Sequence, residues 1–86
     1  MMPYIKDELR YHYEECLAES GINTNTPCGH LNYLLTCIVQ QYLGPQPNYQ
    51  RYCEVEGVLG HMAKELYRRR TAPYEDQKIK ENGDVF

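Results

Sequence analysis

The chain has 86 residues, of which 42% are hydrophobic and 24% charged, and its formal net charge is -3. This length suits one compact domain. The composition excludes a disordered or collagen-like chain, and no stretch approaches the roughly 20 consecutive apolar residues of a membrane-spanning helix. The negative charge disfavours general affinity for nucleic acid or for anionic membranes.

A first helix is predicted over residues 5–20. Asp7 and Glu8 stand in its first turn, where negative charge favours the positive end of the helix dipole. Gly21 is the expected stop, because glycine readily adopts the left-handed conformation that ends many helices. One apolar stripe follows from the spacing of three and four residues between Ile5, Leu9, Tyr13, Cys16 and Leu17.

A second helix is predicted over residues 27–43 and has the strongest periodicity in the chain. Thr26 is expected to cap it, with Pro27 at the first helical position. Gly44 and Pro45 end it, since a proline cannot continue the hydrogen-bond ladder. Its apolar stripe, interpreted as the centre of the core, contains Leu31, Leu34, Leu35, Ile38, Val39 and Tyr42.

A third helix is predicted over residues 48–71, with Asn48 as its cap and Pro73 as its end. A short helical turn over residues 74–81 then closes at Asn82 and Gly83. The fold class is therefore all-α: a small three-helix bundle of residues 1–73 that oligomerises, and a C-terminal docking segment of residues 74–86. The buried side of the third helix is expected to carry Tyr52, Val55, Val58, Leu59, Met62, Leu66 and Tyr67.

Two glycines interrupt the third helix. Gly57 and Gly60 each cost roughly 1 kcal/mol relative to alanine inside a helix. Either they allow close contact between two helices, or they leave room for a ligand or a neighbouring subunit.

The four cysteines form no C-x-x-C pair, and the N-terminus lacks the pattern of a secretory signal. We therefore expect reduced cysteines in a cytoplasmic protein. Cys16, Cys37 and Cys53 are interpreted as small buried apolar residues. Cys28 and His30 lie two apart, but no second such pair completes a zinc site. The sequence predicts neither a metal nor a cofactor.

The most suggestive cluster is Tyr67-Arg68-Arg69-Arg70 at the end of the third helix. Arginine forks bind phosphate or carboxylate, and tyrosine stacks on a base. The alternative is structural: positive charge at a helix C-terminus, or ion pairs with Glu75 and Asp76. The candidate ligand-binding residues are Tyr67, Arg68, Arg69, Tyr74, Gly57, Gly60 and His61.

No catalytic motif accompanies this cluster. Glycine-rich phosphate loops, nucleophile elbows and H-E-x-x-H are absent from the sequence, and the His61–Glu65 spacing is typical of a surface hydrogen bond. We expect a protein that is not an enzyme. Because tyrosine is enriched at interfaces, a homo-oligomer is also expected from the tyrosines outside the stripes, namely Tyr4, Tyr11, Tyr33, Tyr49 and Tyr74.

Several segments resemble a family of short all-helical proteins, a domain of unknown function encoded by bacteriophages and bacteria. The matching segments span nearly the whole chain: Met2–Ile5, Gly29–Tyr33, Tyr42–Leu43, Glu54–Leu59, Glu65–Arg69, Pro73–Asp76 and Lys78–Phe86. The resemblance implies a phage or bacterial origin and no particular activity. A longer Asn- and Thr-rich connection before the second helix and the cysteine pattern depart from the family.

Together these features suggest a small phage-type homo-oligomer in the cytoplasm of a bacterial host. Its expected function is to sequester a small anionic, nucleotide-like signalling ligand as an antagonist of host defence. The alternative is a protein–protein interaction module that binds a host protein. Nucleic acid and membranes are disfavoured as partners.

Overall fold

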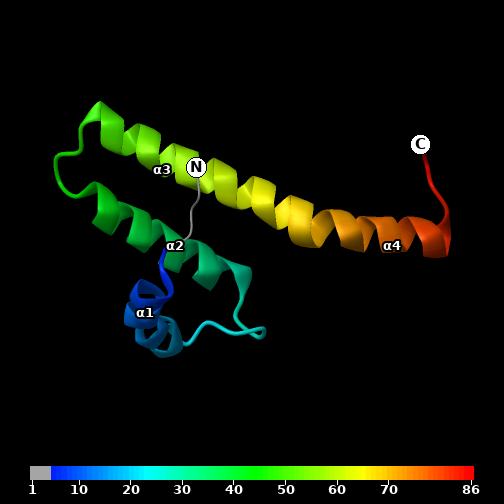
Figure 1. Ribbon diagram of the computed structural model, residues 1–86, viewed down its shortest axis with the longest axis horizontal. Coiled ribbons are helices and arrows are strands. Elements are labelled where there is room, and N and C mark those ends of the chain that lie inside the picture. Colours follow the sequence, from blue (N-terminus) through cyan, green and yellow to red (C-terminus); the bar gives the residue numbers. More distant parts are fainter. Residues whose placement is uncertain (1–4) are drawn as a thin grey trace. The chain divides into compact units, whose positions relative to one another are not determined.

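The computed structural model describes residues 5–86, which contain helices and no strand. Helix α1 spans Asp7–Ser20, α2 spans Cys28–Leu43 and α3 spans Tyr49–Leu66. A π-helical segment, η1, follows over Tyr67–Thr71 and continues directly into α4, Ala72–Asn82 (Figure 1). The prediction of an all-α protein with three helical segments is confirmed, and the three helices begin close to the predicted positions.

Glycines end the helices where the sequence predicts it. Gly21 is left-handed at φ 73°, and its amide donates to the carbonyl of Ala18. Gly44 and Gly83 also have positive φ, of 73° and 88°. These backbone conformations lie where a residue with a side chain is strained, which explains why glycine stands at these positions.

The start of α2 differs from the prediction. Pro27 occupies the cap position, and no side chain caps the helix. The hydroxyl of Thr26 instead accepts a hydrogen bond from the amide of Asn23 at 3.0 Å, and the amide of Thr26 donates to the carbonyl of Asn23. Thr26 therefore closes the turn before α2 rather than capping the helix.

The prediction that Pro73 ends the third helix is wrong. The helix continues past Pro73, which lies in the first turn of α4. The amide of Ala72 donates to the carbonyl of Tyr67, five residues earlier, as in a π-helix. Proline lacks an amide and its ring crowds the carbonyl four residues before it. The wider η1 turn precedes Pro73 and accommodates it, so the helix bypasses the missing hydrogen bond instead of ending.

The chain divides into two units, residues 1–48 and residues 49–86. The first contains α1 and α2. The second is a single helix from Tyr49 to Asn82, followed by a short tail. The division therefore falls in the connection before α3, while residues 73 and 74 lie within one continuous helix. Docking of residues 74–86 on a bundle stays a prediction.

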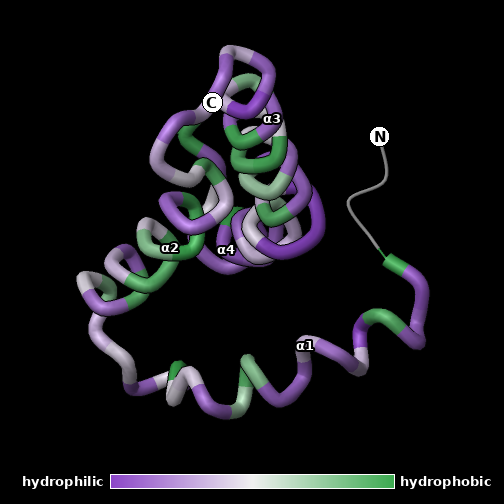
Figure 2. Tube along the Cα trace, turned by 90° about the vertical axis from the view of Figure 1, so that its left-hand side faces the viewer, coloured by the Kyte–Doolittle hydropathy of each residue, from purple (hydrophilic) through white to green (hydrophobic). Residues whose placement is uncertain are grey.

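The expected buried core is not present among the residues that the structure describes. None of residues 5–86 is buried, and the apolar stripe of α3 keeps 40% to 57% exposure at Tyr52, Leu59, Met62 and Leu66. Figure 2 shows hydrophobic and hydrophilic residues alternating along α2 and α3. The periodicity is correct, but one helix cannot cover its own apolar face, and a second surface is needed to bury it.

Two further expectations concern individual side chains. Cys16, Cys37 and Cys53 are exposed free thiols, as is Cys28, so their assignment to the core is wrong. The tyrosines assigned to the surface are indeed exposed at positions 11, 33, 49 and 74, while Tyr4 lies outside the described residues. Among residues 5–86, no helix has the length and apolar character needed to cross a membrane.

Candidate functional site

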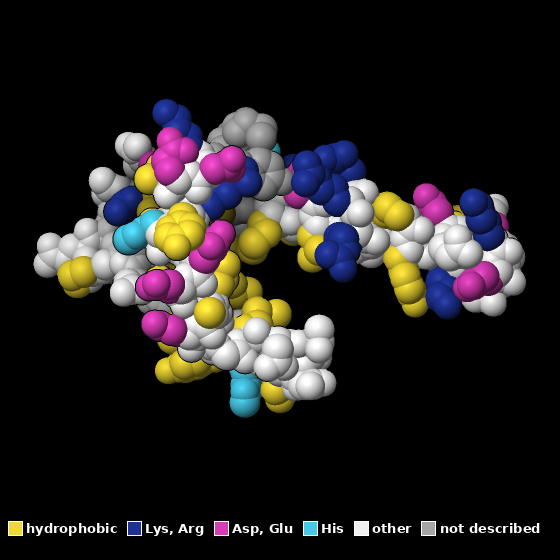
Figure 3. Space-filling view, turned by 60° about the horizontal axis from the view of Figure 1, so that its bottom comes forward, with side chains coloured by type: hydrophobic (Ala, Val, Ile, Leu, Met, Phe, Trp, Pro, Cys, Tyr) yellow, Lys and Arg dark blue, Asp and Glu magenta, His cyan; other side chains and the backbone are white. Residues whose placement is uncertain are grey.

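Basic side chains gather midway along the helix that α3, η1 and α4 form (Figure 3). Glu65 organises two of them. Arg68 forms a two-pronged contact with it, in which Nε donates to Oε1 at 3.1 Å and Nη2 donates to Oε2 at 3.0 Å. Nε of Arg69 lies 3.1 Å from Oε2 of the same carboxylate. This network gives Arg68 and Arg69 a structural partner on the helix surface.

Glu65 was not predicted as this partner, since Glu75 and Asp76 were the expected partners of the arginines. Its spacing of three and four residues from Arg68 and Arg69 is the signal that could have identified it. The hydrogen bond from Arg68 and the charges of Arg68, Arg69 and His61 lower the pKa of the Glu65 carboxyl. Its charged form is therefore favoured in the helix.

We expect Glu65 to titrate below the ordinary glutamate value of 4.5. A carboxyl whose pKa is lowered by folding stabilises the protein above its unfolded pKa, and that stabilisation disappears as the pH falls through the folded pKa. An NMR titration of the side-chain carboxyl carbons measures the midpoint directly. Arg68→Gln should return it towards 4.5, and an unchanged midpoint in this variant would contradict the assigned cause.

Arg70 differs from its two neighbours. No residue among 5–86 forms a hydrogen bond or ion pair with it, and it is exposed. One residue beyond Arg69, it points about 100° further around the helix axis and so away from Glu65. Of the three arginines, Arg70 therefore has its full hydrogen-bonding capacity available to a partner or ligand.

The π-helical segment brings Tyr67 and Glu75 to the same side of the helix although they are eight residues apart. In an α-helix this spacing leaves two residues about 80° apart, and the extra residue of a π turn removes most of that rotation. The hydrogen bond between the Tyr67 hydroxyl and Glu75, together with the charges of Glu75 and Asp76, raises the pKa of Tyr67 above 10.0. Tyr67 therefore stays a neutral donor at physiological pH.

Tyr74 lies on the same stretch of helix and contacts a cation. Nζ of Lys78 is 5.6 Å from the centre of its ring, and Lys78 also pairs with Glu81 at 3.2 Å. Tyr74, Lys78 and Ile79 line an open hollow of about 330 Å³ with the tail from Asn82 to Phe86. No arginine lines this hollow.

Gly57 and Gly60 lie apart from this cluster. Their spacing places them with Cys53 and Lys64 on the side of α3 opposite the apolar stripe. A Cβ at either position would meet nothing within 4 Å. His61 contributes to the cluster through its charge on Glu65. Ligand binding by these residues stays a prediction.

Gly57→Ala and Gly60→Ala are each expected to stabilise the protein by about 0.5–1 kcal/mol, because alanine restricts the unfolded chain and the added methyl group has space. Urea denaturation measures this change. Gly83→Ala is the matched control and should destabilise, since its φ of 88° is strained for alanine. Destabilisation at Gly57 or Gly60 would show that a partner contacts this side of α3.

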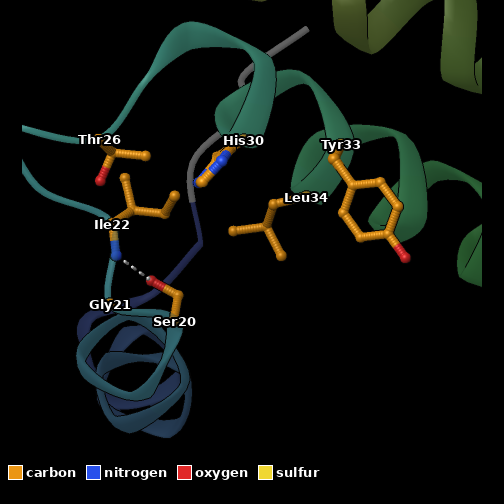
Figure 4. Close-up of a pocket in the computed structure, with 7 residues that line it drawn as sticks. All are labelled: Ser20, Gly21, Ile22, Thr26, His30, Tyr33 and Leu34. Carbon is orange, nitrogen blue, oxygen red and sulfur yellow. Dashed lines mark hydrogen bonds between the residues drawn. The ribbon is translucent and has the colours of Figure 1, made fainter.

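A second hollow, of about 450 Å³, lies in the first unit and was not anticipated (Figure 4). It forms where the turn after α1 meets the start of α2, and His30 and Tyr33 border it. The Ser20 hydroxyl accepts a hydrogen bond from the amide of Ile22 at 3.2 Å and donates to the carbonyl of Leu17. A hydrogen bond with the Cys37 thiol raises the pKa of Tyr33.

Within residues 5–86, no group of three or more His, Cys, Asp or Glu side chains is arranged to hold a metal ion. Comparison with known proteins gives one similarity. No curated protein matches this sequence, and no solved structure matches it. Residues 2–85, nearly the whole chain, match the family described as Domain of unknown function (DUF6899), and the chain therefore belongs to that family.

Proposed function

We propose that this protein is a non-enzymatic interaction module that acts as a homo-oligomer. The observation that carries this proposal is that none of residues 5–86 is buried although all three helical segments bear apolar residues. Contiguous exposed apolar surface is costly in water and typically marks a protein–protein contact. Of the two functions considered from the sequence, a module that binds proteins fits these exposed faces better than an enclosing ligand pocket.

Solution mass tests the proposal. Light scattering of the full chain across a concentration series is expected to give a multiple of 10.2 kDa at micromolar concentrations. A monomer with the same helical content at every concentration would overturn it. If a host protein is the target, it should bind the oligomer in a fixed ratio, measured with the purified partner.

Sequestration of a small anionic, nucleotide-like ligand, in the role of a host-defence antagonist, is the second candidate. Arg70 supports it, because this guanidinium has no partner among residues 5–86 and lies between Tyr67 and Tyr74 in the sequence. Calorimetric titration with cyclic di- and oligonucleotides and ADP-ribose derivatives tests this function. Heat that disappears in Arg70→Ala would support it, and no heat with any member would remove it.

A further inference from the structure

The half of the long helix that contains η1 and α4 exposes apolar side chains along a length that α2 alone cannot cover. The helix from Tyr49 to Asn82 extends over about 50 Å, whereas α2, with 16 residues, extends over about 24 Å. Wherever α2 lies, it cannot cover both halves. The second half exposes Leu66, Tyr67, Tyr74 and Ile79 by 41% to 63%.

The charges of residues 64–81 are arranged antisymmetrically about the midpoint between Ala72 and Pro73. When the segment is aligned with a reversed copy of itself about that midpoint, each charged residue faces either a residue of the other sign or a neutral residue. In the sequence the opposed charged pairs are Lys64–Glu81, Glu65–Lys80, Arg69–Asp76 and Arg70–Glu75, and of these Arg70–Glu75 lies on the side assigned to the second copy below. Leu66 meets Ile79 in the same register.

This register is specific. A shift of one residue in either direction removes the alignment of Arg70 with Glu75 and of Leu66 with Ile79. Opposite charges that meet across two helices are favourable, so the Arg70–Glu75 pair favours the unshifted alignment. An antisymmetric sequence is what a two-fold symmetric antiparallel contact requires, since residue i of each copy meets residue j of the other.

The contacts within the helix indicate which side faces the second copy. Glu65 holds Arg68 and Arg69 on one side. Tyr67 and Glu75 share another side, and Tyr74 with Lys78 lies close to it. Arg70 is turned towards this second side and lacks a partner among residues 5–86. The Glu75 carboxylate can accept from the Tyr67 hydroxyl and still accept from a guanidinium, because two oxygens offer several lone pairs.

We propose that residues 64–81 form an antiparallel helix pair with the same residues of a second copy. Arg70 of each copy pairs with Glu75 of the other, and Leu66 packs on Ile79 at both ends. Tyr67 faces Lys78 of the second copy, a favourable combination of an aromatic ring and a cation. This proposal rests on the homo-oligomer proposed above and specifies one of its interfaces.

A charge exchange in the full chain tests the register. In Arg70→Glu two carboxylates oppose each other, and in Glu75→Arg two guanidinium groups do. Each variant alone is expected to self-associate at least tenfold more weakly than the unchanged protein in sedimentation equilibrium at low salt. An equimolar mixture restores opposite charges at both contacts, and its association should return to within about threefold of the unchanged protein.

Asp76→Arg is the matched control, because it makes the same charge change one residue away on the side that faces away from the second copy. It should associate like the unchanged protein. Its mixed pair with Arg70→Glu restores one of the two contacts, so it should be weaker than the mixed pair of Arg70→Glu with Glu75→Arg, which restores both. If the unchanged protein associates but the two variants do so equally well, or if their mixture is not restored, this interface is wrong and the homo-oligomer stands. If the unchanged protein is monomeric throughout, both proposals fail.

Discussion

Leu59→Asp is expected to weaken self-association at least 100-fold. Leu59 lies in the middle of the apolar stripe of α3 and is 40% exposed in the single chain. Burying a leucine contributes about 1.5–3 kcal/mol, and an aspartate at a covered position adds the cost of removing a charge from water. Each 1.4 kcal/mol changes the association constant tenfold. Sedimentation equilibrium measures the dissociation constant.

Cys53→Asp is the control for this prediction. It introduces the same carboxylate into α3 on the side opposite the stripe, where Gly57 and Gly60 also lie. It should leave the association constant within a few-fold of the unchanged protein. Equal loss in the two variants would indicate that the carboxylate disrupts α3 itself, and no loss in Leu59→Asp would show that the stripe is not the covered surface.

Ala63→Pro is expected to destabilise the protein by about 3 kcal/mol, since proline removes the amide that bonds to residue 59 and crowds that carbonyl. A domain of this size has a total unfolding free energy of only about 4–13 kcal/mol, so near the lower end about one molecule in six would be unfolded at 25 °C. Circular dichroism at 222 nm with urea denaturation measures both effects.

Two substitutions separate the loss of the amide from general changes in helix propensity. Ala63→Gly keeps the amide and should cost only about 1 kcal/mol. Pro73→Ala removes the native proline, and its effect should be much smaller than that of Ala63→Pro, because the π-helical segment already accommodates the ring. If Ala63→Pro and Ala63→Gly were equally destabilising, the intact ladder at residue 63 would not be the cause.

The behaviour of Pro73 illustrates where sequence reasoning was insufficient. Proline ends a regular α-helix, and that rule predicted a stop. The chain instead forms one wider helical turn over Tyr67–Thr71. The spacing of apolar residues does not predict such a turn, because the turn only changes the hydrogen-bond partners of a few residues. The wider turn also changes which side chains meet. It places Tyr67 beside Glu75, eight residues away, a contact that α-helical spacing would not suggest.

The candidate site was likewise predictable from the sequence only in part. The cluster around Tyr67, Arg68 and Arg69 was evident from composition, because three adjacent arginines are conspicuous in an acidic chain. The Glu65 network was also readable in principle from its spacing. The difference between Arg70 and its two neighbours could be recognised only from the structure, because it depends on the side of the helix on which each guanidinium lies.

The sequence by itself determined the all-α class, the places where helices begin and the glycines that end them, because caps, prolines and apolar spacing act within a few residues. Only the tertiary structure decided that the stripes and cysteines are exposed rather than buried, and that the third helix passes through Pro73. Burial depends on a second surface. A local apolar pattern indicates that a helix face needs such a surface, but it does not identify the surface that covers it.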